Sequence, residues 1–388
     1  MAQQALPDIE LHFGILANAA IIARLCSLDW EMRRKAIVLL SGGLDSMLAA
    51  RLMQEQGIIV EGINFYTGFC IENHTRMIQG HSGERRHQAL WVAERLDIPL
   101  HIVDVSEAYH QVLLQPQYGY GATLNPCLDC KIFMVKQAAM FLEKATEVAS
   151  ARAVDRGADF LVTGEVIGQR LKSQLKWTMP LIARESGVND RLLRPLSAQI
   201  LPPTLPEREG WVDRARLFGF NGRSRQPQIE LAQSLGFTEW AQPAGGCCFL
   251  TDAAYSRKLQ DLWSARGARD YTLDDVVLLK VGRHIRPQPH FKLIISRNAG
   301  ETQFLEGYRR TLYSMQALSH AGPLALVDGE LRPEDHQVAA RIVARYSQGK
   351  AAEQVTVGLF DRQKMLERRW EVVPFAAGDV EGSWHVGC

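Results

Sequence analysis

The sequence lacks a dominant charge. Its 388 residues carry 44 Lys and Arg against 43 Asp and Glu, so the formal net charge is only +1. A chain with this balance is not a polycation, and any contact with nucleic acid has to come from local basic patches. Internal repeats and low-complexity tracts are also absent, which excludes repeat arrays and sequences of biased composition.

Long apolar runs are missing as well. The most apolar N-terminal stretch, residues 11–25, is too short for a membrane span, follows acidic residues and precedes no clear cleavage site. We therefore expect a cytoplasmic protein without a membrane partner. Its composition, 46% hydrophobic and 22% charged, is typical of a globular chain, and its length predicts two or three domains. Seven irregularly spaced cysteines in a reducing compartment favour ligands or catalysts over disulfides.

The most informative motif is Ser41-Gly42-Gly43-Leu44-Asp45-Ser46, directly after the apolar run 36–40. Five apolar residues without alternation predict a buried parallel strand. The recurrence of Leu44, Leu48 and Leu52 predicts a helix that ends near Gly57. Two glycines before a helix N-terminus let backbone N–H groups approach a phosphate.

The polar side chains of this loop suit the same chemistry. Ser41 and Ser46 supply hydroxyl donors, and we expect Asp45 to help hold a magnesium ion or to orient the loop. No lysine follows the glycines, so the loop is not a Walker-type P-loop. An ordinary strand-turn-helix corner is the alternative interpretation.

Strand and helix patterns alternate from residue 35 to residue 168. Further strands are predicted at 60–65, 101–105 and 160–163, with helices at 83–96 and 128–156. This order predicts a doubly wound α/β fold with a parallel sheet, whose ligands lie at the carboxyl ends of the strands. Residues 180–227 read as irregular and 228–270 as helical. Beyond residue 271 we expect a small α+β domain with strands at 276–281 and 292–296 and a helix at 334–347.

The cysteines supply the second chemical signal. Cys127 and Cys130 lie three residues apart after Asn125 and Pro126, which suit the N-cap and the first position of a helix. A helix N-terminus lowers a thiol pKa and favours the thiolate. A third thiolate comes from the turn at 245–248, where either Cys247 or Cys248 is the candidate.

Three kinds of site fit these cysteines. They are a structural zinc site with four ligands, a Cys-x-x-Cys redox pair, and an iron–sulfur cluster held by three cysteines with one iron open. Cys70 follows the second predicted strand, where an accessory thiol and an inert one are both open. Cys26 and Cys388 receive no role.

Loop and cysteines together resemble the ATP pyrophosphatase (PP-loop) superfamily and, within it, the tRNA thiouridine synthases. The chain is most similar to the short, iron–sulfur-dependent relatives of the 4-thiouridine synthases. The resemblance runs from about residue 35 to 262 and includes motifs at 41–46, 125–131, 157–170, 193–198, 222–225 and 245–247.

The resemblance implies an adenine nucleotide alpha hydrolase-like fold and an AMP- and pyrophosphate-forming tRNA sulfurtransferase. ATP with Mg²⁺ adenylates a uridine oxygen, and a hydrosulfide on a [4Fe-4S] cluster then replaces AMP, most simply yielding 4-thiouridine. The partners are tRNA and a sulfide or persulfide donor, with a homodimer left open. The implied ATP-binding residues are Ser41, Gly42, Gly43, Leu44, Asp45, Ser46 and Gly164. Asp45, Cys127, Cys130 and Cys247 are implied as catalytic, the three cysteines as cluster ligands.

Four domains follow from this reading: an N-terminal extension (1–34), the ATP-binding domain (35–200), a cysteine-bearing segment that completes the active site (201–270) and the α+β domain (271–388). The last resembles RNA-associated modules. We expect Met32 to be the more natural start and an RNA-binding module ahead of the loop to be absent. Basic residues within 169–176 and 208–225 are candidate tRNA contacts, and Glu165 is either catalytic or structural.

Three other functions remain open on the same residues. The first is 2-thiouridine synthesis through a persulfide on Cys127 and a disulfide with a partner cysteine. The second is an amide-forming ligase of the same superfamily, which has no need of the cysteines. The third is a non-catalytic RNA-binding protein with structural zinc, which leaves the loop unexplained.

Overall fold

The computed structural model describes residues 33–71, 87–149, 157–240, 247–376 and 378–387. The chain divides into two compact units, each assembled from separate stretches of sequence. The first unit comprises residues 1–63, 93–101 and 135–239, and the second comprises 64–92, 102–134 and 240–388. The predicted domain boundaries at residues 34, 200 and 270 stay a prediction, and nearly all of the predicted extension lies outside the described residues.

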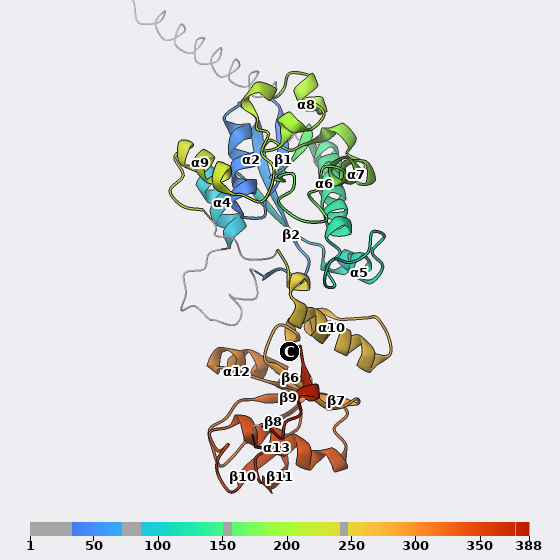
Figure 1. The fold of residues 1–388 in the computed structure, drawn as a ribbon, viewed down its shortest axis with the longest axis vertical. Coiled ribbons are helices and arrows are strands. Elements are labelled where there is room, and N and C mark those ends of the chain that lie inside the picture. Colours follow the sequence, from blue (N-terminus) through green and yellow to red (C-terminus); the bar gives the residue numbers. More distant parts are fainter. Residues whose placement is uncertain (1–32, 72–86, 150–156, 241–246, 377, 388) are drawn as a thin grey trace, which may run out of the picture. The chain divides into compact units, whose positions relative to one another are not determined.

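A five-stranded sheet has the order β3-β2-β1-β4-β5. Two of its strands, β1 and β2, are labelled in Figure 1. Its strands are β1 (Lys35–Leu39), β2 (Ile59–Tyr66), β3 (Leu100–Asp104), β4 (Phe160–Thr163) and β5 (Leu192–Leu193). β1 pairs in parallel with both β2 and β4, so the strand order reverses beside β1. The predicted doubly wound parallel sheet is confirmed, and its switch point is where such folds bind ligands.

Helices lie between these strands and after the last of them. They are α2 (Leu44–Gln54), α4 (Gln88–Leu96), α5 (Ser106–Leu114), α6 (Cys127–Ala149), α7 (Thr178–Glu185), α8 (Leu205–Arg208) and α9 (Gln226–Ser234). Helix α2 buries Leu44, Leu48 and Leu52, as their spacing predicts. Gly57 then adopts a left-handed φ of 78°, which a residue with a Cβ rarely does. The predicted irregular region 180–227 in fact holds α7, β5 and several short helical turns.

A seven-stranded antiparallel sheet fills the C-terminal part, in the order β11-β10-β8-β9-β7-β6-β12. Its strands are β6 (Arg283–Gln288), β7 (Phe291–Ile295), β8 (Tyr313–Ala317), β9 (Ala325–Gly329), β10 (Val355–Phe360), β11 (Leu366–Val372) and β12 (His385–Val386). Alternate residues of β7 join different cores: Leu293 packs with helix α13 (His336–Tyr346), whereas Ile294 packs on the other side. Helices α10 (Ala253–Arg266), α11 (Leu273–Leu278) and α12 (Ala299–Glu306) complete this α+β region.

One predicted strand is wrong. Residues 276–281 are not extended, because the helix α11 runs through their first half. Thr272 and Asp275 form a reciprocal capping box, with the Asp275 N–H donating to Thr272 Oγ1 at 3.2 Å. Val276 joins one apolar core while Leu278 and Val281 join another, so a run of apolar residues is buried on two sides without a strand. Local capping therefore outweighs the strand preference of the two valines.

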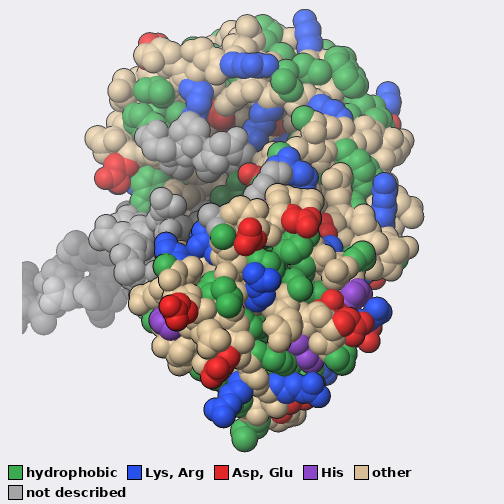
Figure 2. Space-filling view, turned by 60° about the horizontal axis from the view of Figure 1, so that its bottom comes forward, with side chains coloured by type: hydrophobic (Ala, Val, Ile, Leu, Met, Phe, Trp, Pro, Cys, Tyr) green, Lys and Arg blue, Asp and Glu red, His purple; other side chains and the backbone are tan. Residues whose placement is uncertain are grey.

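Surface charge follows the balanced composition. On the face drawn in Figure 2, basic and acidic side chains are interspersed over the described residues. None of the described helices has the length and apolar character that crossing a bilayer requires.

Candidate functional site

The Ser-Gly-Gly loop joins β1 to α2 in the first unit. Its two serines fold the loop on itself, because the Ser46 hydroxyl donates to the Gly43 carbonyl at 2.9 Å and lies 3.3 Å from Ser41 Oγ. Gly43 is the N-cap of α2 and provides no side-chain cap. The N–H groups of the first turn are thus left for an external acceptor, as a phosphate-binding loop requires.

The three glycines of this region have different structural roles. Gly42 needs its left-handed φ of 79°, whereas Gly43 has an ordinary φ of −79° and ψ of 160°. Gly164, just beyond β4, lies against the loop so closely that an added Cβ would stand 2.4 Å from the backbone of Asp45. The absence of a side chain at Gly164 therefore fixes where β4 meets the loop.

Asp45 has an incompletely satisfied carboxylate. Its Oδ2 accepts a hydrogen bond from Gln169 Nε2 at 2.8 Å, while Oδ1 is buried without a hydrogen-bond partner among the described residues. Burial raises the pKa of Asp45, and the bond from Gln169 and the charges of Arg225 and Arg170 oppose that rise. A buried oxygen of this kind suits Mg²⁺, which takes one or two carboxylates together with substrate phosphates. The sequence analysis proposes Gln169, Arg170 and Arg225 as tRNA contacts. It does not predict that they surround Asp45.

Glu165 has a structural role. It is 2% exposed and its Oε2 accepts hydrogen bonds from Thr163 Oγ1 at 2.8 Å and from Arg194 Nε at 3.0 Å. Arg194 also donates to the carbonyl of Met179 at 3.1 Å. This buried ion pair ties the end of β4 to the segments that follow it, so the structural alternative is the one that the contacts favour.

Three of the arginines proposed to contact tRNA are engaged within the protein. Arg208 pairs with Asp190, Arg214 pairs with Glu207, and Arg216 donates to a backbone carbonyl of Glu55 at 2.8 Å. Contact of this stretch with tRNA stays a prediction.

The second unit brings together cysteines from three distant stretches of the chain. Thr123 Oγ1 donates to the carbonyl of Leu250 at 2.6 Å, and the N–H of Leu124 donates to Ser256 Oγ at 3.3 Å. These bonds join the turn before Cys127 to the segment after Cys248. Cys70 enters the same cluster through a β-bridge to Cys248. The structure carries these cysteines as thiols.

Cys127 begins α6, as predicted, and the N-cap role of Asn125 stays a prediction. The side-chain carbonyl of Asn125 accepts from the Thr123 backbone N–H at 3.2 Å and lies 2.8 Å from Thr123 Oγ1. Its amide group donates to Cys127 Sγ at 3.0 Å. An N–H donor at this distance stabilises negative charge on the sulfur.

The expectation of a lowered thiol pKa is wrong for Cys130. Burial raises the pKa of Cys130 to about 12, and the nearby Cys247 raises it further. The hydroxyl of Tyr109, which hydrogen-bonds this sulfur, and the charge of Lys131 act in the opposite direction without prevailing. Packing against an aromatic core therefore outweighs the helix N-terminus.

Cys70 and Cys248 face each other across two antiparallel backbone segments. The N–H of Phe249 donates to the carbonyl of Phe69 at 2.9 Å, so the two cysteines occupy the neighbouring, closely spaced pair. Lys280 adds a buried ammonium group beside them: it donates to the Gly68 carbonyl at 2.5 Å and lies 5.1 Å from the ring of Phe249. Sequence reasoning missed Lys280 because it fell in the segment interpreted as a strand.

The thiols do not form a ready metal site. Within the described residues, no group of three or more His, Cys, Asp and Glu side chains is arranged to hold a metal ion. The electrostatic influence of Cys127 and Cys247 on Cys130 does place the three thiols near one another. The [4Fe-4S] cluster at these cysteines gains no support from this geometry and stays a prediction. Gly245 and Gly246 lie outside the described residues.

Two family models match separate parts of the chain. Residues 34–176 match the tRNA methyl transferase HUP domain. This segment is similar to a HUP domain. The superfamily resemblance and the fold class predicted from the sequence are thereby confirmed. Residues 282–385 match the NFACT protein RNA binding domain, in line with the predicted resemblance of the C-terminal part to RNA-associated modules.

Curated relatives match the N-terminal part. A tRNA-specific 2-thiouridylase MnmA of Geotalea uraniireducens is 32% identical over 139 residues, which is 34% of each chain. That of Pelobacter propionicus is 36% identical over 135 residues, covering 34% of this chain and 33% of the relative. The chain thus spans about a third of the length of these relatives. A solved 4-thiouridine synthetase–RNA complex with bound ATP is 20% identical, covers 52% of this chain and 50% of its own, and has a TM-score of 0.29.

Substituting the two glycines tests their different roles. We expect Gly164→Ala to lower the free energy of unfolding by about 1–3 kcal/mol, because the new Cβ overlaps backbone atoms that cannot yield. Gly43→Ala is the matched control: its Cβ would lie 3.6 Å from Ser41 Oγ, and the fold should keep its stability. Urea denaturation of both variants measures this difference. Equal stability of the two would contradict the close packing at Gly164.

The cysteine bridge predicts a specific cross-link. Mild oxidation with the thiol oxidant diamide should join Cys70 to Cys248, because closely spaced antiparallel pairs match the Cα separation of a disulfide. Peptide mapping by mass spectrometry identifies the product, in which two thiols have lost two hydrogens. Cys248→Ser should abolish the cross-link, and Cys247→Ser should retain it. A disulfide from Cys70 to Cys247 instead would disprove the predicted pairing.

Proposed function

We propose that this chain catalyses the ATP-dependent thiolation of a uridine in tRNA. The observation that carries the proposal is a chain with an ATP pyrophosphatase loop whose Asp45 keeps an unpartnered oxygen, and with a cluster of thiols from three distant stretches. Neither an amide-forming ligase nor a zinc-bearing RNA-binding protein explains both features. That the loop and the thiols act on one substrate is part of the proposal.

The first half of the reaction activates the uridine. Backbone N–H groups at the start of α2 and the hydroxyls of Ser41 and Ser46 would hold the triphosphate, and Asp45 would hold Mg²⁺, which would neutralise phosphate charge. The uridine oxygen attacks the α-phosphate, and pyrophosphate leaves. The adenylated oxygen is then a good leaving group, which a uridine carbonyl oxygen is not.

The second half delivers sulfur. In the route that the thiols support, Cys127 carries a persulfide obtained from a persulfide donor. Its terminal sulfur attacks the activated carbon, and AMP leaves with the former uridine oxygen. A neighbouring thiol then attacks the cysteine sulfur, the thiouridine departs, and a disulfide remains for a thiol reductant to open. The N–H of Asn125 at the Cys127 sulfur supports the choice of this cysteine.

The names of the relatives bear on the position of the new sulfur. Two relatives with similar sequences are named tRNA-specific 2-thiouridylases, which favours the O2 oxygen. The cluster-dependent synthesis of 4-thiouridine that the sequence resemblance implied is the competing version. Mass spectrometry of tRNA nucleosides from cells lacking this protein should show a loss of 2-thiouridine. A loss of 4-thiouridine instead would favour the cluster-dependent version. If neither nucleoside is lost, the proposal of tRNA thiolation is contradicted.

Two substitutions separate activation from sulfur transfer. Asp45→Asn should slow tRNA-dependent pyrophosphate release at least about tenfold, because a neutral amide binds Mg²⁺ poorly. Cys127→Ser should leave pyrophosphate release unchanged and abolish thiouridine formation. Asp97→Asn, an exposed change at a residue with a left-handed φ of 51°, is the control for Asp45. Thiolation that survives Cys127→Ser would refute the assigned nucleophile.

A further inference from the structure

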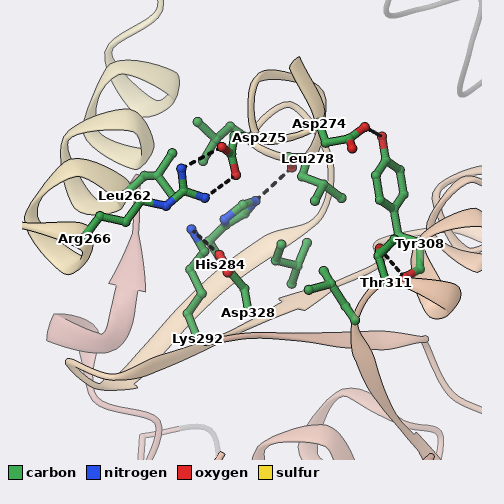
Figure 3. A pocket seen from close by; sticks show the side chains of 13 residues that line it. Leu262, Arg266, Asp274, Asp275, Leu278, His284, Lys292, Tyr308, Thr311 and Asp328 are labelled. Atoms are coloured by element: carbon green, nitrogen blue, oxygen red, sulfur yellow. Dashed lines mark hydrogen bonds and ion pairs between the residues drawn. The ribbon is translucent and has the colours of Figure 1, made fainter. Parts of the chain in front are cut away.

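A partly open pocket of about 190 Å³ lies within the second unit, between α10, α11 and the antiparallel sheet (Figure 3). Its walls include Arg266, Asp275, His284, Lys292 and Asp328. Neither the ATP loop nor the thiols contribute to it. A space of this size accepts one planar ring rather than a whole nucleotide.

The charges in this pocket are paired with one another. Arg266 holds Asp275 through two hydrogen bonds of 2.7 and 2.8 Å. Lys292, which is 1% exposed, lies 3.3 Å from Asp328 and 3.6 Å from Asp261. Carboxylates therefore accompany each cation, so the pocket favours a neutral ligand over a phosphate.

His284 leaves one atom to be satisfied. Its Nε2 lies 2.9 Å from the carbonyl of Val281 and 3.2 Å from that of Leu278, so Nε2 carries the proton and donates. The ring is 2% exposed, and Nδ1 is buried without a hydrogen-bond partner among the described residues. Burial and the charges of Lys258 and Lys292 hold the pKa of His284 well below its usual range, so Nδ1 is a bare acceptor.

The pocket thus presents one hydrogen-bond acceptor and one donor, so a matching ligand carries a donor next to an acceptor. Nδ1 of His284 accepts one hydrogen bond, and the ammonium group of Lys292, drawn beside the ring in Figure 3, donates. Its ion-pair distances of 3.3 and 3.6 Å are longer than a hydrogen bond in good geometry, which leaves donor capacity. A ring N–H next to a carbonyl, the imide edge of uracil or the lactam edge of guanine, matches this pair.

We propose that the pocket of His284 and Lys292 binds one unpaired nucleobase with an N–H donor beside a carbonyl oxygen. This inference rests on the proposed function, because tRNA is the substrate that would present the base. The N–H donates to His284 Nδ1, and the carbonyl accepts from Lys292 Nζ. The base contact positions the RNA and takes no part in a chemical step.

Binding of uridine 5′-monophosphate to the full chain tests the pocket. We expect N3-methylation of the nucleotide to weaken binding at least about tenfold, because it removes the donor to His284. Ribose 5-phosphate, which has no base, should not bind. The ¹⁵N signal of His284 Nδ1 should shift on adding uridine monophosphate and stay in place on adding the methylated analogue.

Variants provide the second arm. Lys292→Met should weaken uridine monophosphate binding by a similar factor, and Lys350→Met, which removes an exposed charge, should not. Leu312→Phe fills the pocket from its apolar wall and should block binding even if Lys292→Met fails to fold. Equal binding of the two nucleotides, or an unmoved His284 signal, would overturn the proposal. If the chain distinguishes the two nucleotides but does not thiolate tRNA, the proposed function is wrong and the proposed base pocket still holds.

Discussion

The hydrogen bond from Thr123 to the carbonyl of Leu250 is the contact on which the thiol cluster depends. It joins two turns separated by more than a hundred residues, one just before Cys127 and the other just after Cys248. A side-chain hydroxyl that donates to a carbonyl far away in the sequence holds the two turns directly against each other. The side-chain oxygen of Asn125 lies 2.8 Å from the same hydroxyl, and its amide group donates to Cys127 Sγ, so the position of one sulfur is coupled to the closure of the two turns.

The ATP loop depends on a different constraint, the close approach of two backbones. Gly164 at the end of β4 meets the loop after β1, and these two strands are neighbours on either side of the point where the sheet order reverses. Helix α2 then begins without a side-chain cap, and Asp45 is held by one hydrogen bond from Gln169. The carboxyl ends of two central strands thus support a loop. Its backbone N–H groups and one carboxylate oxygen of Asp45 can bind a ligand.

The sequence was sufficient for four of the five strands of the parallel sheet, because these are mainly apolar segments separated by stretches with a helix period. The two-residue strand β5 lies in the region predicted as irregular. Strand β4 has the predicted bounds, and α2 buries the three predicted leucines. The strand predicted at 276–281 failed for a local reason, since a capping box at Thr272 decides in favour of helix where valine favours a strand.

The candidate site was predictable only in part, for physical reasons that particular residues illustrate. Cysteine spacing indicated the first turn of α6, which is a local property. The surroundings of a sulfur atom are not local: Tyr109, Lys280 and Cys70 approach the thiols from other parts of the chain. For the same reason the lowered pKa expected of Cys130 was wrong, because burial is set by the packing of distant aromatic residues.

The two cysteines of α6 also have different surroundings. Cys130 is held as a neutral thiol against the aromatic core, where its hydrogen-bond partner is the hydroxyl of Tyr109. Cys127 lies one turn earlier and receives an amide N–H, the kind of donor that favours charge on sulfur. A persulfide needs an anionic terminal sulfur to attack an activated base, whereas a resolving thiol needs protection until that attack is complete. In the proposed route, the amide donor at its sulfur therefore favours Cys127 as the carrier of the persulfide.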